Sequence, residues 1–194
     1  MAVYLTIAAV AALIFAYPHI RIFVKRISLA LRLRRFCRKH GVTMTPSNPL
    51  WFLASKRSTH PALFLETATH AWAIALFSVP KRASTLILSD NGTYQIETYL
   101  TLINVLTVTY HFHNRPRPLA EVNYYTGAPD RVWVKHFTPV TLVNPGCLGM
   151  KANLHGRAEL LGNGDTFGGT VWCSFDRLRS MIEFALDREA GRVE

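Results

Sequence analysis

Residues 1–41, MAVYLTIAAVAALIFAYPHIRIFVKRISLALRLRRFCRKHG, decide the architecture of this 194-residue chain. The run from Ala2 to Tyr17 is apolar, and the first charged side chain is Arg21. As a helix rising about 1.5 Å per residue, Ala2 to Ile20 spans roughly 28 Å, close to the hydrocarbon thickness of a bilayer. We therefore expect residues 1–20 to form a retained transmembrane anchor. A cleaved signal peptide fits less well because no basic side chain precedes the run, and a buried core helix is the remaining alternative.

The positive charge of the chain is concentrated directly after this run. The formal net charge is +10, yet the chain from residue 58 onward holds twelve basic and twelve acidic side chains and is neutral. Residues 1–57 hold ten Lys or Arg and no Asp or Glu. Because basic residues favour the cytoplasmic side, we expect a single-pass protein with its N-terminus outside and its body in the cytoplasm. A nucleic-acid-binding domain more often carries its cations on the folded body, so nucleic acid is the less favoured partner.

Residues 21–41 are expected to form a basic amphipathic helix next to the membrane. At 3.6 residues per turn, one side collects five cations and a serine: Arg21, Lys25, Ser28, Arg32, Arg35 and Lys39. An apolar stripe lies beside them, made of Ile20, Phe23, Val24, Ile27, Ala30 and Leu31, and a second sector of Leu29, Leu33 and Phe36 is available to contact the body. The five cations are candidates for binding anionic lipid head groups, and the alternative is that they only fix the topology. Cys37 is an ordinary helix residue or a juxtamembrane acylation site.

Residues 42–194 predict one compact domain of mixed α/β class. Strands are expected at 50–54, 62–67, 71–78, 85–89, 93–97, 131–137, 141–143, 159–161 and 170–173, whereas 99–110 fits a helix or a strand. Asp90-Asn91-Gly92 is a hairpin signal, because Asn and Gly tolerate positive φ. Ser174 fits the N-cap of a final helix whose apolar face carries Phe175, Leu178, Ile182 and Ala185.

Few residues are candidates for a metal site. His111 and His113 would point to the same face of a strand, and a further ligand could come from any of His60, His70, His136, Glu66 and Asp90. No spacing identifies the complete set, so a structural pair of histidines is the simpler interpretation. The glycine-rich residues 162–169 lead into a strand and not a helix, which predicts a hairpin turn and not a phosphate loop. No cofactor is implied, and the three cysteines lack the spacing of a zinc site.

The expected order of elements resembles the core of restriction-endonuclease-like proteins. It consists of a helix over 27–40, strands near 50–54, 62–67 and 71–78, a later strand at 141–143 and a C-terminal helix. The resemblance implies an acidic residue on the second core strand, for which Glu66 could stand, and a Glu-x-Lys motif on the third. The third strand, Trp72-Ala73-Ile74-Ala75-Leu76, has neither residue of that motif. The resemblance therefore implies a nuclease-like fold without the machinery for phosphodiester cleavage.

These features favour a membrane-anchored protein whose small cytoplasmic α/β domain serves interaction or regulation with an unknown protein partner. No catalytic site is recognised, and a non-enzymatic role is favoured over an enzymatic one. The first alternative is a membrane-tethered, metal-dependent hydrolase or nuclease-like domain, degenerate in its site. The second alternative is a nucleic-acid-binding module that uses the basic helix.

Overall fold

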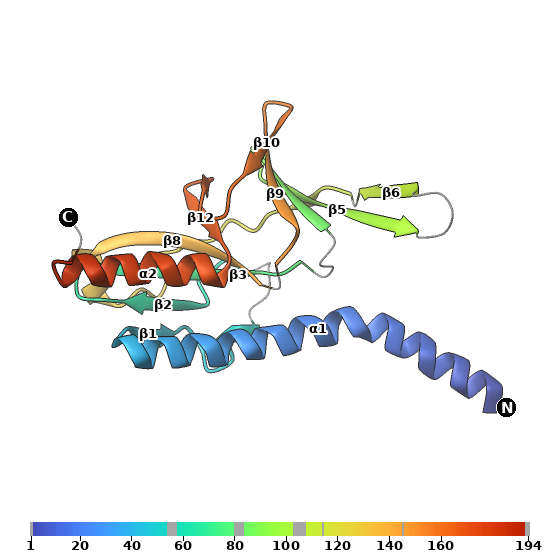
Figure 1. The fold of residues 1–194 in the computed structure, drawn as a ribbon, viewed down its shortest axis with the longest axis horizontal. Helices are drawn as coiled ribbons and strands as arrows, with labels where there is room; N and C mark the ends of the chain where they lie inside the picture. The colour runs from blue at the N-terminus through green and yellow to red at the C-terminus, as the bar shows by residue number, and fades with distance from the viewer. Residues whose placement is uncertain are drawn as a thin grey trace.

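The computed structural model describes residues 2–53, 58–79, 84–102, 108–113, 115–144 and 146–192. Within these ranges, it leaves out the side chains of residues 2–16, 18, 99–102, 108–113 and 133. Two helices and two mixed β-sheets make up the described fold, which establishes the α/β class (Figure 1). Both helices lie against the first sheet, and the second sheet extends away from them.

The first sheet has the strand order β1-β2-β3-β8-β12-β11. Its strands are β1 (Thr43–Pro46), β2 (Leu63–Glu66), β3 (His70–Phe77), β8 (His136–Val143), β11 (Thr166–Phe167) and β12 (Thr170–Cys173). β3, β8 and β12 run parallel, and the other pairs are antiparallel. β3 and β8 are paired along their whole length, from His70 opposite His136 to Phe77 opposite Val143. This long parallel pair is the centre of the domain.

The second sheet has the order β10-β9-β4-β5-β6, with β7 paired to β5. Its strands are β4 (Ser84–Ser89), β5 (Thr93–Leu102), β6 (Val108–His113), β7 (Arg117–Pro118), β9 (Gly149–Leu154) and β10 (Arg157–Leu161). The predicted hairpin at Asp90-Asn91-Gly92 is confirmed, because it joins β4 to β5 and Gly92 has a φ of 73°. The turn predicted over residues 162–169 is confirmed only in part, because β11 lies inside this range and β10 pairs with β9 instead of β12. Gly168 and Gly169, both at positive φ, join β11 to β12.

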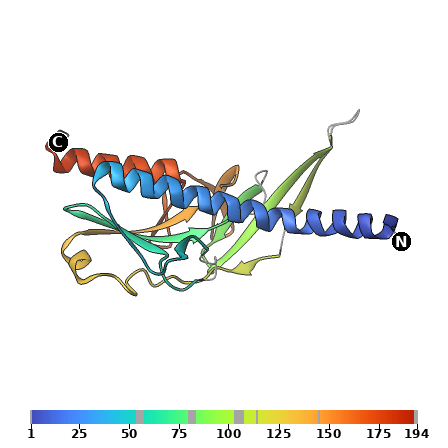
Figure 2. The same ribbon diagram turned by 90° about the horizontal axis from the view of Figure 1, so that it is seen from below.

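A shared core joins both helices to one face of the first sheet. α1 (Ala2–His40) contributes Leu29, Leu33 and Phe36, the apolar sector that the sequence predicted to be available for contact with the body. α2 (Phe175–Glu189) contributes the predicted set of Phe175, Leu178, Ile182 and Ala185. Ser174 is its N-cap, and the Ser174 hydroxyl accepts a hydrogen bond from the Arg177 N–H. Figure 2 shows the two helices side by side on this face.

Two smaller clusters complete the interior. Phe77, Tyr94 and Trp172 pack edge to face where the end of the first sheet meets the second sheet. On the sheet face opposite the helices, Phe64 and Tyr124 join a cluster to which the segment 122–128 contributes. The two sheets are therefore connected by packed aromatic side chains.

Three expectations for the strands need correction or completion. Residues 51–53 form a 3-10 helix, η1 (Trp51–Leu53), because the wholly buried Trp51 packs into the core shared with α1. A second 3-10 helix, η2 (Asp130–Val134), replaces most of the expected strand at 131–137, and β8 begins only at His136. Between residues 99 and 110, the described parts belong to β5 and β6 and are strand, with 103–107 outside the described residues.

α1 is a single helix of 39 residues, so the segments 1–20 and 21–41, which the sequence analysis treated separately, belong to one continuous helix up to His40. At about 1.5 Å per residue it is roughly 58 Å long, and its N-terminal part extends beyond the body (Figure 1). Within the described residues, we find no helix whose length and apolar character together suffice to cross a membrane. The structure describes only the backbone of the run 2–16, on whose side chains the expected anchor depends.

Candidate functional site

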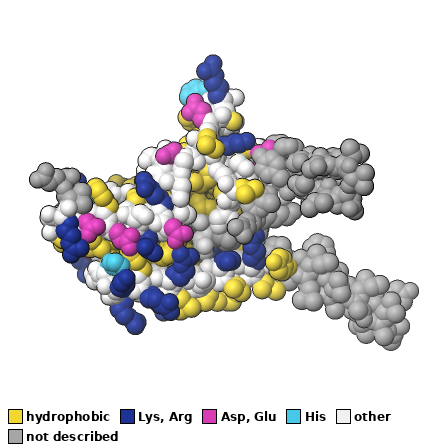
Figure 3. All heavy atoms as spheres, viewed as in Figure 1, with side chains coloured by type: hydrophobic (Ala, Val, Ile, Leu, Met, Phe, Trp, Pro, Cys, Tyr) yellow, Lys and Arg dark blue, Asp and Glu magenta, His cyan; other side chains and the backbone are white. Residues whose placement is uncertain are grey.

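The face of α1 that points away from the domain exposes large apolar side chains. Tyr17, Ile20, Phe23, Val24 and Leu31 are between 48% and 66% exposed. Figure 3 shows apolar side chains along this edge of the molecule and cations further along the same helix. Ala30, which the sequence assigned to the same stripe, is instead buried against the domain. An apolar patch next to cations on one helix is typical of a surface that contacts a membrane or a partner.

The five predicted lipid-binding cations divide into two groups along α1. Arg21 and Lys25 lie beside the exposed apolar side chains, and Lys25 is exposed. Arg32, Arg35 and Lys39 lie at the other end of the helix, next to α2. The structure thus exposes four of the five on α1, leaves Arg21 half-buried, and gives the last three a second element as neighbour.

A cationic groove lies between α1 and α2. It has a volume of about 230 Å³ and is lined by Arg32, Arg35, Phe36, Lys39, His40, Phe175, Arg179 and Glu183. Only Arg32, Arg35 and Lys39 were predicted as site residues, and the two further basic side chains, His40 and Arg179, were not. Arg179 is about 140 positions away from the basic helix, so only the packing of α2 beside α1 brings it there.

Two carboxylates neutralise part of the charge in this groove. Arg32 Nη2 lies 2.9 Å from Asp176 Oδ1, and its guanidinium carbon lies 4.4 Å from the centre of the Phe175 ring. Arg179 Nε lies 3.1 Å from Glu183 Oε1, and His40 Nε2 lies 4.0 Å from the same oxygen. The Arg32–Asp176 pair is exposed and Arg179 meets the half-buried Glu183 from the solvent side, so each pair contributes little to stability.

Arg26 is a buried cation that ties α1 to the point where the chain leaves the first sheet. Its Nε donates a hydrogen bond of 3.0 Å to Ser78 Oγ, and the Asn144 side chain donates to the Lys25 carbonyl at 3.2 Å. Burial lowers the pKa of Arg26. Arg26 falls on the helical side of Leu29 and Leu33, and this periodicity could have identified it as inward-facing.

A cleft of about 1140 Å³ separates the ends of the two sheets. Its lining includes Thr141 and Thr170 of the first sheet, Tyr124, Trp172 and the β4–β5 hairpin at Asp90. The Tyr124 hydroxyl lies 2.7 Å from Thr141 Oγ1. Burial raises the pKa of Tyr124, so the phenol stays protonated at neutral pH. Concave, largely apolar spaces of this kind are the usual place for a ligand.

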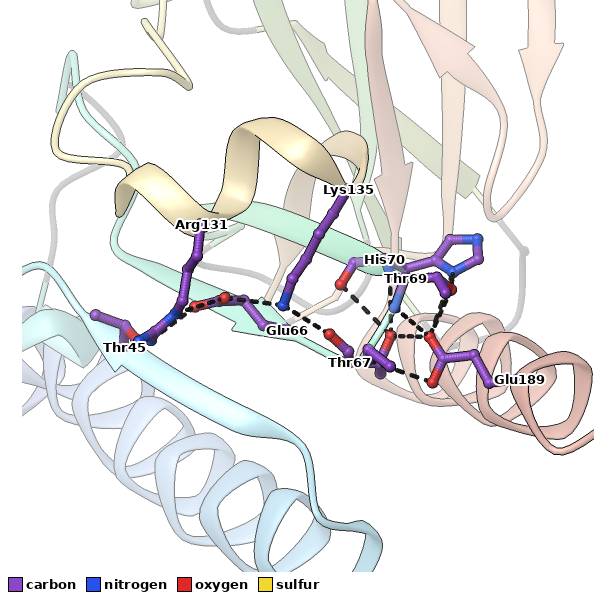
Figure 4. Close-up of polar contacts among 9 residues, drawn as sticks. Thr45, Glu66, Thr67, Thr69, His70, Arg131, Lys135 and Glu189 are labelled. Atoms are coloured by element: carbon purple, nitrogen blue, oxygen red, sulfur yellow. Dashed lines mark hydrogen bonds and ion pairs between the residues drawn. The ribbon is translucent and has the colours of Figure 1, made fainter.

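Glu66, a weak candidate for a metal ligand, forms ion pairs with two basic side chains. Its side chain is 1% exposed, and Arg131 Nε and Lys135 Nζ lie 2.8 and 3.2 Å from its Oε2 (Figure 4). Burial alone would raise the pKa of Glu66, but hydrogen bonds and charge from these two side chains lower it. The pairing also explains why residues 130–134 turn as η2 rather than extend: the turn carries Arg131 and leads to Lys135. Glu66 is part of a structural ion pair.

Three other metal candidates lie on the second sheet. Asp90 accepts the backbone N–H of His155 at 2.9 Å, and the His155 ring lies 3.5 Å away. The backbones of His111 and His113 belong to β6, but their side chains lie outside the described residues. In the described part of the chain, no group of three His, Cys, Asp or Glu side chains gathers in a way that could hold a metal ion.

Glu189, at the end of α2, clamps the turn between β2 and β3. Its carboxylate accepts hydrogen bonds from the Thr67 and Thr69 hydroxyls, both at 2.6 Å, and from the N–H groups of Thr69 and Ala68 (Figure 4). Burial raises its pKa, but these hydrogen bonds dominate and lower it to about 2. This contact fixes α2 to the first sheet.

The cysteines do not form a reactive site. Cys37 and Cys173 are buried, and burial raises their pKa values to about 11 and about 12. Cys37 therefore faces the core and does not present its sulfur to the membrane surface, which corrects the acylation hypothesis.

Comparison with known proteins found no matching family model. No curated protein matches the chain. No solved structure matches its fold.

Proposed function

We propose that the protein is a single-pass membrane protein whose α/β domain is an interaction or regulatory module on the cytoplasmic side. The supporting observation is that α1 has two apolar faces. Leu29, Leu33 and Phe36 are buried in the domain, whereas Tyr17, Ile20, Phe23 and Val24 are exposed outside it. The domain uses only the first face, so the second requires another apolar environment.

The exposed side chains lie where a bilayer surface would meet the helix. If residues 1–20 span the hydrocarbon, Tyr17 to Val24 covers about 10 Å at its boundary. Tyr17 there matches the aromatic belt of membrane proteins, and Arg21 and Lys25 reach the head groups. Ile20 to Arg32 is about 18 Å further along a continuous helix, beyond a Debye length of about 8–10 Å. Arg21 and Lys25 are thus the proposed lipid-binding cations for an upright helix.

The cleft between the sheets supports the proposed role of the domain in interaction. Among its lining residues, Tyr125 and Leu154 are exposed and offer apolar surface there, whereas Tyr124, Trp172, Thr141 and Thr170 are buried in its wall. The carboxylates of Glu66 and Glu189 are taken up by structural contacts, and so they support no hydrolytic role. The restriction-endonuclease-like core and the metal-dependent activity stay hypotheses that no described contact favours over the interaction role. Nucleic acid is not a proposed partner.

The orientation has a built-in reporter at the tip of the β4–β5 hairpin. Asn91-Gly92-Thr93 is a glycosylation acceptor, Asn91 is exposed, and its side chain accepts the Thr93 N–H at 3.1 Å. The full chain, given an N-terminal extension with a second acceptor, is expressed in eukaryotic microsomes. We expect the sugar on the extension and none on Asn91, because the cation cluster keeps the body in the cytoplasm.

An Asn91→Gln variant shows which acceptor carries the sugar, because a glycosylated band that persists in this variant belongs to the extension. Modification at Asn91 would contradict the orientation. If alkaline carbonate releases an unmodified chain from the membrane, the anchor itself is contradicted.

A further inference from the structure

The groove between α1 and α2 carries more positive charge than the nearby carboxylates neutralise. Arg32, Arg35, Lys39 and Arg179 line it, against the carboxylates of Glu183 and the adjacent Asp176. In the part of the chain that the structure describes, no ion pair engages Arg35 or Lys39. Like charges that share a small hollow repel one another, and an anion between them relieves this repulsion.

We propose that the groove between α1 and α2 binds a phosphate group. Arginine suits this ligand because its planar guanidinium donates two parallel hydrogen bonds to phosphate oxygens, and Lys39 adds a compact charge. The Phe175 ring stacks against Arg32 and orients its guanidinium, which lowers the entropic cost of binding. The ion pairs to Asp176 and Glu183 lie at the surface and are weak, so an incoming phosphate displaces them easily.

The two helices contribute different parts of this site. Arg32, Arg35 and Lys39 follow one another along α1, while Arg179 reaches the groove from α2. The core beneath, with Leu33 and Leu178 wholly buried, holds the helices at a fixed separation. The cations are therefore assembled before the ligand arrives, unlike those of an isolated basic helix.

The phosphate has two sources, a lipid head group or a phosphorylated molecule in solution. An upright α1 holds Arg32 about 18 Å along the helix from Ile20 and favours the soluble source, whereas a tilted α1 brings the groove to the bilayer. Only the lipid source rests on the proposed membrane attachment. Binding of a soluble phosphate stands or falls without it.

The test uses the full chain in neutral detergent micelles at about 0.15 M salt. One arm titrates glycerol 3-phosphate, and the other titrates phosphatidic acid in the micelle, with phosphatidylcholine as the blank. The Arg35→Gln/Lys39→Gln variant removes two groove cations. The Arg34→Gln/Arg38→Gln variant removes two exposed cations of the same helix that do not line the groove.

We expect saturable binding in at least one arm, weakened about tenfold or more by Arg35→Gln/Lys39→Gln. Arg34→Gln/Arg38→Gln should weaken it by no more than about twofold, because those charges are screened. Binding in the soluble arm identifies a dissolved source, and binding in the lipid arm alone identifies a head group. No saturable binding in either arm, or an equal loss in both variants, would overturn the proposal.

A second variant separates a lost site from a damaged fold. Glu183→Gln removes the carboxylate that competes for Arg179, and we expect it to tighten binding about threefold. Unchanged or weaker binding in this variant would contradict the groove as the site. If glycerol 3-phosphate binds as expected but the glycosylation reporter shows the opposite orientation, only the proposed function fails.

Discussion

α1 and α2 pack side by side on the same face of the first sheet and share one core. They run in the same direction, since Arg32 meets Asp176 and His40 meets Glu183 further along. The outer face of α2 is polar except for the exposed Phe184, whereas the outer face of α1 exposes several large apolar side chains. A helix that only covers a sheet needs one apolar face. The second apolar face of α1 therefore indicates a contact outside the domain.

The largest expected effect is a difference in stability between two leucine variants, one on each apolar face of α1. Leu33 is 0% exposed and lies in the core, while Leu31 is 60% exposed. We expect Leu33→Ala to lower the free energy of unfolding by about 3 kcal/mol, because it removes buried surface and leaves a cavity. Leu31→Ala should change it by less than about 0.5 kcal/mol. Chemical denaturation in neutral micelles measures both.

Equal destabilisation by the two variants would show that the domain itself depends on the outer face. The comparison between the helices would then lose its basis, because the exposed side chains would have a structural role within the domain.

A smaller effect on stability is expected from the contact that attaches α2 to the first sheet. The pKa of Glu189 is about 2 in the folded chain and about 4.3 for an ordinary glutamate, so its carboxylate stabilises the fold above pH 5. This contribution disappears as the pH falls from about 4.3 through 2. We expect Glu189→Gln to lower the free energy of unfolding by about 2 kcal/mol at pH 7, and the difference from the wild type to vanish near pH 2.

Urea denaturation over this pH range measures the difference, with Glu183→Gln as a matched change on the same helix. A difference between Glu189→Gln and the wild type that stays constant from pH 7 to pH 2 would contradict the clamp at the β2–β3 turn.

Local patterns in the sequence were enough to predict α2 and several strands of both sheets, whereas β1, β9 and β11 were not predicted. The spacing of Phe175, Leu178, Ile182 and Ala185, with Ser174 before it, predicted the helix, its start and its buried face. β2, β3 and the β4–β5 hairpin also followed from short-range signals. Each of these signals depends on residues within one element or one turn.

Contacts between distant residues could not be predicted in this way. Glu66 meets Arg131 and Lys135, which are more than 60 positions away, and this contact converts an expected strand into η2. Trp51 turns residues 51–53 into η1 by packing into the core that α1 shares. The groove needs Arg179 beside Arg35, which only the packing of α2 against α1 supplies. Tertiary contacts outweighed local propensity at these places.

Site-directed spin labelling of the full chain in vesicles tests most directly whether the outer face of α1 lies in lipid. With Cys147→Ser to remove the more accessible thiol, labels are placed at Ile20→Cys on α1 and at Ser180→Cys on the exposed side of α2. Oxygen partitions into hydrocarbon and a nickel chelate stays in water. We expect the Ile20 label to be relaxed mainly by oxygen and the Ser180 label mainly by nickel. The two labels are carried by separate variants. Nickel relaxation of the Ile20 label equal to that of the Ser180 label would contradict lipid contact. Broadening of the Ile20 spectrum by the label of a second copy of the chain would contradict it as well.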